Sequence, residues 1–155
     1  MNRIRVLLAS DFVLLRAGLH ALLQACANVE VIGECAAGPE TIERVKETQP
    51  DILIVDVSPA DRETFSAIKS LWKETSATRI IALSATADSE FVLQLLRAGV
   101  LGCLSEHEAM TELVSAVNAV ALGEVFLCPS ASGALLDKYR KQSQTRKRVA
   151  LRNNC

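Results

Sequence analysis

The chain of 155 residues is half hydrophobic but only 4% aromatic, which suits one domain with an aliphatic core and a short appendage. Its formal charge of −1 hides an asymmetry, because Lys138 to Cys155 holds seven basic side chains and no acid, whereas residues 1–137 carry ten basic and eighteen acidic ones. Five scattered cysteines without a CxxC pair argue against a disulfide framework or a zinc site, and no signal peptide or membrane-spanning stretch is present, so we expect a cytoplasmic protein with no membrane contact.

Apolar runs alternate with amphipathic segments along the chain. The predicted strands are 4–9, 29–34, 52–55, 79–84 and 102–104. The predicted helices are 12–26, 39–48, 65–72, 89–98 and 109–122. In the first helix, Arg16, His20 and Gln24 recur at the spacing of a solvated stripe, whereas Trp72 and Met110 fall on the predicted inner faces of their helices.

The strict alternation of strand and helix predicts an α/β fold of the (βα)5 type. Its connections are too long for hairpins, so the strands should form a parallel sheet with helices on both faces. We predict a flavodoxin-like, doubly wound sheet of order 2-1-3-4-5. Residues 1–123 would form this domain, and residues 124–155 a linker and a basic tail. A capped helix is expected at 130–141, followed by a solvated, partly disordered end.

Polar residues stand where four of the predicted strands end. Asp11, Asp56, Ser84 and Glu106 follow strands one, three, four and five, and the carboxyl ends of parallel strands share one edge of the sheet. Two carboxylates and a strand-end carbonyl form a hard, oxygen-rich site that suits Mg²⁺. The alternative for Asp56 is an acid that only caps the following turn. A flavin site fits less well, because no phosphate-binding loop follows the first strand.

Several short motifs in this order and spacing resemble the receiver domain of bacterial two-component response regulators, of the NarL/FixJ (LuxR-type) family. They are RIRVLLASD ending at Asp11, RAGL, VEVIGE, PDILIVD ending at Asp56, ALS ending at Ser84, LRAG and GCL. The resemblance runs from about residue 4 to residue 129.

The resemblance implies a role for each matching position. Asp56 would accept a phosphoryl group from the phosphohistidine of a histidine kinase. Asp11, Asp56 and the backbone carbonyl of Ser58 would hold Mg²⁺, and the hydroxyl of Ser84 would hydrogen-bond the phosphoryl group and move when the domain switches. The partners would be a sensor histidine kinase or another signalling protein, and a homodimer as in many relatives. No enzyme activity is implied beyond phosphorylation and dephosphorylation at Asp56 itself.

Five positions depart from the family pattern. They are Ser10 in place of the first acid, Phe12 in place of a frequent His, the early Pro59, Cys103 in place of an aromatic, and Glu106 in place of the lysine that pairs with the phosphoryl group. An acid in place of a base reverses a Coulomb energy of roughly 4 kcal/mol at a separation of 4 Å and an effective dielectric constant near 20. These departures favour a second interpretation, a pseudo-receiver that acts as a phosphorylation-independent interaction module.

The end of the chain differs from that of the family in another way. NarL/FixJ regulators usually continue into a helix-turn-helix module of several dozen residues, for which residues 130–155 leave no room. We therefore expect no complete DNA-binding domain in this sequence, and no specific DNA binding. Basic residues alone would contact nucleic acid only non-specifically.

Overall fold

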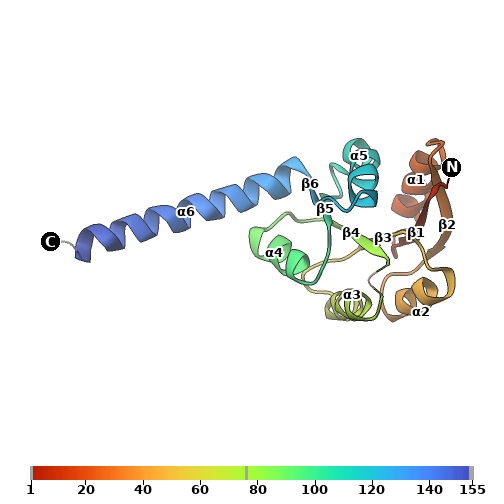
Figure 1. The fold of residues 1–155 in the computed structure, drawn as a ribbon, viewed down its shortest axis with the longest axis horizontal. Helices are drawn as coiled ribbons and strands as arrows, with labels where there is room; N and C mark the ends of the chain where they lie inside the picture. Colours follow the sequence, from red (N-terminus) through yellow and green to blue (C-terminus); the bar gives the residue numbers. More distant parts are fainter. Residues whose placement is uncertain (1, 76, 154–155) are drawn as a thin grey trace.

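The computed structural model describes residues 2–75 and 77–153, and its centre is a parallel sheet (Figure 1). The strand order is β2-β1-β3-β4-β5-β6. The strands are β1 (Ile4–Ala9), β2 (Val29–Cys35), β3 (Ile52–Asp56), β4 (Arg79–Ser84), β5 (Gly102–Ser105) and β6 (Phe126–Leu127). The predicted fold class and the order 2-1-3-4-5 are confirmed. The sixth strand is an addition, because Phe126 and Leu127, within the stretch expected to begin a linker, pair with β5.

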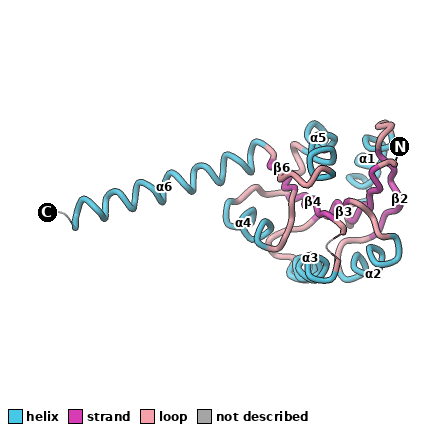
Figure 2. Tube along the Cα trace, in the orientation of Figure 1, coloured by secondary structure: helices cyan, strands magenta, loops and turns pink. Residues whose placement is uncertain are grey.

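Helices cover both faces of the sheet (Figure 2). They are α1 (Val13–Gln24), α2 (Pro39–Thr48), α3 (Arg62–Glu74), α4 (Ser89–Arg97), α5 (Ala109–Ala121) and α6 (Pro129–Asn153). α1 and α5 lie on one face, and α2, α3 and α4 lie on the other. Every residue of β3 is buried because it lies between these layers, as its unbroken apolar run indicates. No helix in the described part of the chain is long and apolar enough to cross a membrane.

Polar caps and one glycine fix where the helices begin and end. The carboxylates of Asp61 and Asp88 accept hydrogen bonds from the backbone N–H groups of Thr64 and Phe91 and so begin α3 and α4. Gly99, at φ 95°, follows α4, and a Cβ atom there would overlap the ring of Trp72.

Two aromatic or flexible side chains lie outside the core where the helical pattern predicted them inside. Trp72 is 56% exposed and Met110 is 52% exposed, so both predictions were wrong. Trp72 covers the glycine turn after α4 rather than the sheet. The aliphatic neighbours on the same helices, Leu71 and Leu113, fill the positions against the strands.

Helix α6 is the largest departure from the expected fold. The sequence predicted a short helix and a partly disordered end, but one helix runs from Pro129 to Asn153; the last two residues of the predicted tail lie outside the described residues. Its first turns pack against α4 and β5, where Ala131 is buried, and the N–H of Ser130 donates to a carboxylate oxygen of Glu108 (3.5 Å). The rest of α6 projects away from the sheet (Figure 1).

Candidate functional site

The carboxyl edge of the sheet holds an open cleft of about 250 Å³. It is lined by Asp11, Phe12, Ala37, Asp56, Val57, Ser58, Asp61, Ala85 and Glu106. Four of the five residues predicted for the site, Asp11, Asp56, Ser58 and Glu106, therefore share one cleft. The parallel register explains this, because β1, β3 and β5 all end here.

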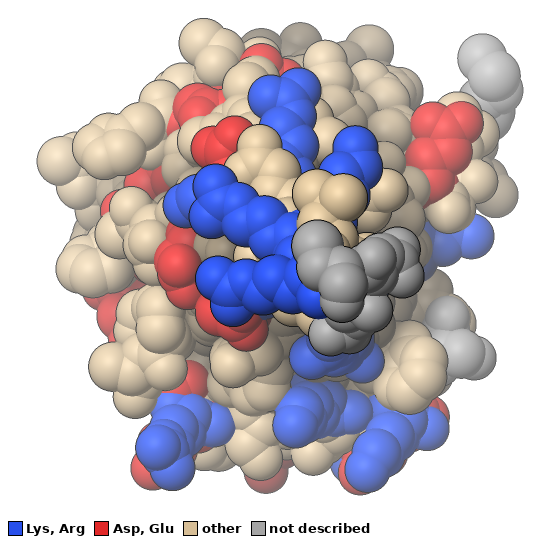
Figure 3. Space-filling view, turned by 90° about the vertical axis from the view of Figure 1, so that its left-hand side faces the viewer, with Lys and Arg blue, Asp and Glu red and all other residues tan. Residues whose placement is uncertain are grey.

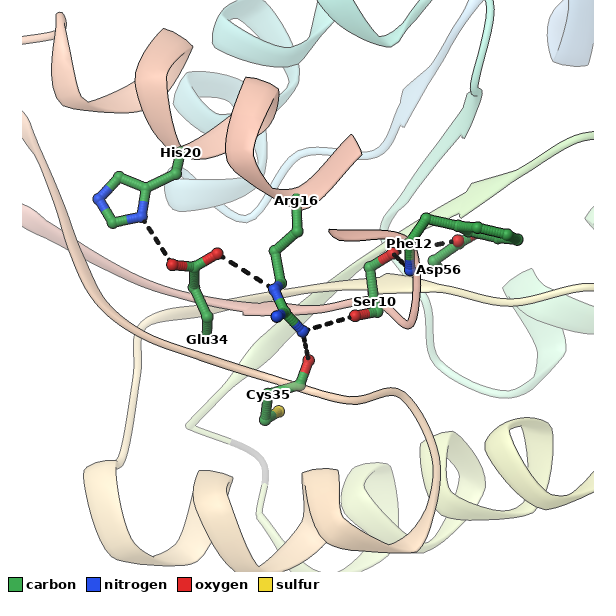
Figure 4. A network of polar contacts seen from close by, with 7 residues as sticks. All are labelled: Ser10, Phe12, Arg16, His20, Glu34, Cys35 and Asp56. Carbon is green, nitrogen blue, oxygen red and sulfur yellow. Dashed lines mark hydrogen bonds and ion pairs between the residues drawn. The ribbon is translucent and has the colours of Figure 1, made fainter. Parts of the chain in front are cut away.

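Asp56 lies at the bottom of the cleft and is only 9% exposed. The Val57 N–H that follows it donates to the Leu83 carbonyl (2.9 Å), which fixes the end of β3 against β4. The Ser10 hydroxyl donates to Asp56 Oδ2 (3.3 Å) and in turn accepts a hydrogen bond from the Phe12 N–H (3.1 Å). The residue that replaces the expected first acid is thus a hydrogen-bond donor to the central carboxylate (Figure 4).

The surroundings of Asp56 favour its neutral form. Burial raises the pKa of Asp56 from 3.8 to about 7, and the neighbouring Glu106 carboxyl adds to the rise through repulsion and hydrogen bonding. Asp11 makes a smaller contribution in the same direction, whereas the hydrogen bond from Ser10 lowers the pKa. Near neutral pH the carboxyl group of Asp56 is therefore only partly ionised.

Asp11 and Glu106 are held by backbone contacts at the two sides of the cleft. Asp11 Oδ1 accepts a hydrogen bond from the Ala37 N–H (3.1 Å), which ties the end of β1 to the loop after β2. The Glu106 N–H donates to the Ser84 carbonyl (2.9 Å), which places its side chain directly after β5. The acid that stands at the family's lysine position thus lies in the same cleft as Asp56.

Ser84 is not among the residues that line this cleft. Its hydroxyl accepts a hydrogen bond from the Thr86 N–H (3.3 Å), and the residue borders a separate small cavity of about 10 Å³ between β4, β5 and α4. Cys103 and Ala131 also line that cavity. A cavity of this size holds about one water molecule.

Arg16 connects the ends of β1 and β2, a role the helical pattern did not predict. Its Nη1 donates to the carbonyls of Ser10 (2.8 Å) and Cys35 (3.3 Å), and its Nε pairs with Glu34 (3.2 Å) (Figure 4). His20 Nδ1 contacts the other oxygen of Glu34 (3.1 Å). The side chain of Arg16 is only 25% exposed, so its assignment to a solvated stripe was wrong. The spacing of Arg16 and His20 was compatible with a shared acid on a neighbouring strand, but only the fold identifies it.

The cleft offers the right atoms for a hard cation but not a complete carboxylate cage. Within residues 2–75 and 77–153, no three His, Cys, Asp or Glu side chains are grouped closely enough to hold a metal ion. A cation here would depend on two carboxylates, a backbone carbonyl and water. Mg²⁺ accepts such a site because it retains several of its waters, and the mutual repulsion that raises the pKa of Asp56 is the kind that a cation relieves.

The fold and the acidic cleft define a receiver module, and the chain belongs to the response regulator receiver domain family, whose model matches residues 6–118. The transcriptional regulatory protein LiaR of Bacillus subtilis is 32% identical over 141 residues, which cover 91% of this chain and 67% of LiaR. The oxygen regulatory protein NreC of Staphylococcus epidermidis is 28% identical over 91% of this chain and 65% of its own length. The relatives are NarL/LuxR-type regulators, and the chain spans about two thirds of their length.

Solved structures agree with the fold. A LuxR-family response regulator from Aurantimonas sp. SI85-9A1 superposes with a TM-score of 0.83 at 24% identity, covering 89% of this chain and 99% of that one. The isolated receiver domain of RcsB from Salmonella enterica serovar Typhimurium, determined with the phosphomimetic BeF₃⁻, gives a TM-score of 0.77 at 25% identity, covering 86% and 99% of the two chains. Receiver domains are signalling modules rather than classical enzymes.

Proposed function

We propose that this receiver accepts a phosphoryl group on Asp56 from the phosphohistidine of a sensor kinase and passes the signal on through protein contacts. One observation carries the proposal: Asp56 lies at the bottom of an open cleft whose walls include Asp11 and Ser58. We assign this function to residues 1–123 and treat residues 124–155 as the linker and basic tail. Four free cysteines among the described residues support a reducing, cytoplasmic setting.

The chemistry requires the ionised form of Asp56. One of its oxygens forms a bond to phosphorus while the bond from phosphorus to the histidine nitrogen breaks, and the imidazole leaves with that electron pair. Ser10 lowers the pKa of Asp56 and so favours the nucleophilic form. Glu106 acts in the opposite direction, because its charge opposes both the ionised acid and an incoming phosphoryl group.

The residues suited to hold Mg²⁺ are Asp11, Asp56 and the carbonyl of Ser58. When bound, the ion would supply positive charge next to the phosphoryl group. This matters more here because Ser10 and Glu106 stand where the family has its first acid and its lysine. The hydrogen bond from the Ala37 N–H to Asp11 Oδ1 restricts the orientation of this carboxylate at the cleft and supports this assignment. To donate to a phosphoryl oxygen, the Ser84 hydroxyl would have to reach the cleft, which Ser84 does not line, and Cys103 provides no aromatic ring to follow such a movement.

The test is to add Mg²⁺ with a small phosphodonor or BeF₃⁻ and to follow Asp56 by mass spectrometry and NMR. We expect modification or occupancy that depends on Mg²⁺ and vanishes in Asp56→Asn. Mg²⁺ alone should raise the melting temperature, because it relieves repulsion among the cleft acids, and Asp56→Ala should weaken this effect. An unmodified Asp56 under conditions that label an ordinary receiver would contradict the proposal.

A second candidate function is a phosphorylation-independent interaction module built on the same fold. It is favoured by the pairing of Glu106 with Asp56, whose pKa of about 7 keeps much of the carboxyl group protonated at neutral pH. This pseudo-receiver would keep its partner affinity in Asp56→Asn, whereas a phosphoacceptor would lose its response to the donor. A partner or a homodimer whose affinity is the same with and without BeF₃⁻ would support the second candidate.

A further inference from the structure

The outer part of α6 carries side chains that the body of the protein does not cover. From Tyr139 to Arg152 every residue except Ser143 is exposed, whereas Ala131 in the first turn is buried. An unsupported helix of this length is only marginally stable in water, since most helical stability in proteins comes from packing. The outer part therefore depends on its sequence or on a partner for its stability.

The unbalanced positive charge of this outer part also favours binding of a partner. We define the basic arm as the six exposed cations beyond the body: Arg140, Lys141, Arg146, Lys147, Arg148 and Arg152. No acid follows Asp137 in the sequence, so Arg146, Lys147, Arg148 and Arg152 have no carboxylate three or four residues away on their own helix. Only Arg140 and Lys141 lie within a turn of Asp137, and Lys138, closer to the body, pairs with Glu90 of α4.

The charge of the body is opposite to that of the arm. Residues 1–137 hold ten basic and eighteen acidic side chains, a formal charge of −8. Figure 3, which faces the C-terminal end of α6, shows Lys and Arg gathered around that end, with acids beside them on the body and further Lys and Arg along the lower edge. A polyanion would therefore be attracted to the arm and repelled by the rest of the molecule.

The distribution of cations around the helix indicates which kind of polyanion the arm would bind. At about 100° per residue, Lys141, Arg148 and Arg152 share one face, whereas Arg140 and Lys147 lie on another. The exposed apolar residues Val149 and Leu151 project from different sides of the helix. The arm thus has no continuous apolar face for a membrane surface, which an interfacial helix requires.

We propose that the basic arm binds the phosphate backbone of double-stranded DNA without reading its sequence. A B-form DNA duplex carries about one charge per 1.7 Å of its axis, and its major groove, about 12 Å wide, admits a single α-helix with cations on several sides. Four of the six cations are arginines, whose forked guanidinium groups suit phosphate oxygens. This binding is separate from the chemistry proposed at Asp56 and does not depend on it.

The test is fluorescence anisotropy of the full chain with a labelled duplex of random sequence, titrated at increasing salt. We expect binding at about 50 mM salt that weakens steeply, with a slope of log K against log[salt] of about −5 if all six cations contact phosphates. Replacing Arg146, Lys147 and Arg148 by Gln should weaken binding at least about 10-fold and reduce the slope by about 2.7.

The matched control removes the same charge from the body. Arg62, Lys69 and Lys73 of α3 are exposed and lie outside both the cleft and the arm. Their replacement by Gln should change the affinity by less than about 2-fold, since these residues lie on the acidic body. Circular dichroism and melting curves on both triple variants show whether each remains folded.

Three results would overturn the proposal. The first is no binding of the duplex by the intact chain at low salt. The second is an equal loss of affinity in the two triple variants, which would mean that only total charge matters. The third is tighter arm-dependent binding to polyglutamate, or to vesicles of anionic phosphatidylglycerol, than to the duplex, which would assign the arm to an acidic protein or to a membrane.

Discussion

The Asp56 cleft and the basic arm both gather like charges, but the fold constrains the two groups in different ways. In the cleft, three strands bring Asp11, Asp56 and Glu106 to one edge, and the pKa of Asp56 is raised first by burial and then by repulsion from Glu106. In the arm, the cations lie on an exposed helix, where water and salt screen them. Protons and divalent cations should therefore control the cleft, whereas monovalent salt should control the arm.

Reversing one charge in the cleft should have the largest effect. Glu106→Lys converts repulsion of an anion on Asp56 into attraction, a Coulomb change of several kcal/mol by the estimate of about 4 kcal/mol per pair at 4 Å. We expect BeF₃⁻ or phosphodonor uptake to rise by at least about 10-fold in the presence of Mg²⁺, and the apparent affinity for Mg²⁺ itself to fall.

Asp56→Asn in the lysine background is the control for this experiment. It should abolish the gain, because a general charge effect would persist without the acceptor carboxylate. If Asp56 stays unmodified in Glu106→Lys, the charge explanation fails and the losses at Ser10 and Cys103 keep the site silent.

The pH dependence of stability should show the next largest effect. The folded protein keeps a proton on Asp56 up to about pH 7, whereas in the unfolded chain this carboxyl ionises near pH 3.8. The resulting stabilisation is complete below pH 3.8 and is lost as pH rises towards 7, so the free energy of unfolding from this group falls across that window. We expect a loss on the order of 2 kcal/mol between pH 5 and pH 7.5, measured by urea unfolding.

Asp56→Asn separates this group from the other carboxyls, since it cannot ionise and should flatten the pH profile. Saturating Mg²⁺ should flatten it as well, because the bound cation stabilises the ionised form of the acid. A profile with the same slope in the wild type and in Asp56→Asn would contradict the assigned pKa of about 7.

Arg16→Ala should have a moderate effect on stability. It removes two hydrogen bonds to strand-end carbonyls and an ion pair with Glu34, which together should lower the free energy of unfolding by about 1–3 kcal/mol. The melting temperature response to Mg²⁺ should also weaken, because Arg16 holds the carbonyl of the residue before Asp11. Gln24→Ala, on the same helix but exposed, is the control and should change neither quantity.

Removing residues 145–155 should have the smallest effect on the stability of the body. Residues 145–152 are exposed and lie on the part of α6 that projects from the sheet, so the change should be less than about 1 kcal/mol. Removing residues 129–155 should cost more, because it also removes the buried Ala131. A large loss of stability in the shorter truncation would mean that the arm docks on the acidic body.

The sheet was predictable because its signals are local and repeated. Each strand is an apolar run that ends in a polar residue, and the connections require parallel pairing, so Asp11, Asp56 and Glu106 could be placed at one edge from the sequence. The two-residue strand β6 was missed because Phe126 and Leu127 are too few to show a period.

The finer details of the site depend on side-chain directions that periodicity does not contain. The position of Ser84 in the sequence did not indicate that this residue lines the Cys103 cavity and not the Asp56 cleft. The Arg16 side chain contacts the residue after β1 and residues of β2, up to 19 positions away from it in the sequence. The raised pKa of Asp56 required both the burial of the strand end and the proximity of Glu106, and only the packed structure combines them.

The junction of α6 with the body also has a mechanical consequence. Ala131 forms part of the wall of the cavity that Ser84 and Cys103 border, so the base of this long helix rests on the element expected to move during switching. The 25 residues of α6 extend over about 37 Å. A tilt of about 5° at Ala131 would therefore move the far end by about 3 Å, from a displacement of only a few tenths of an ångström at the base. In this geometry α6 acts as a lever: its first turn contacts the sheet, and its long outer part carries the cations of the basic arm.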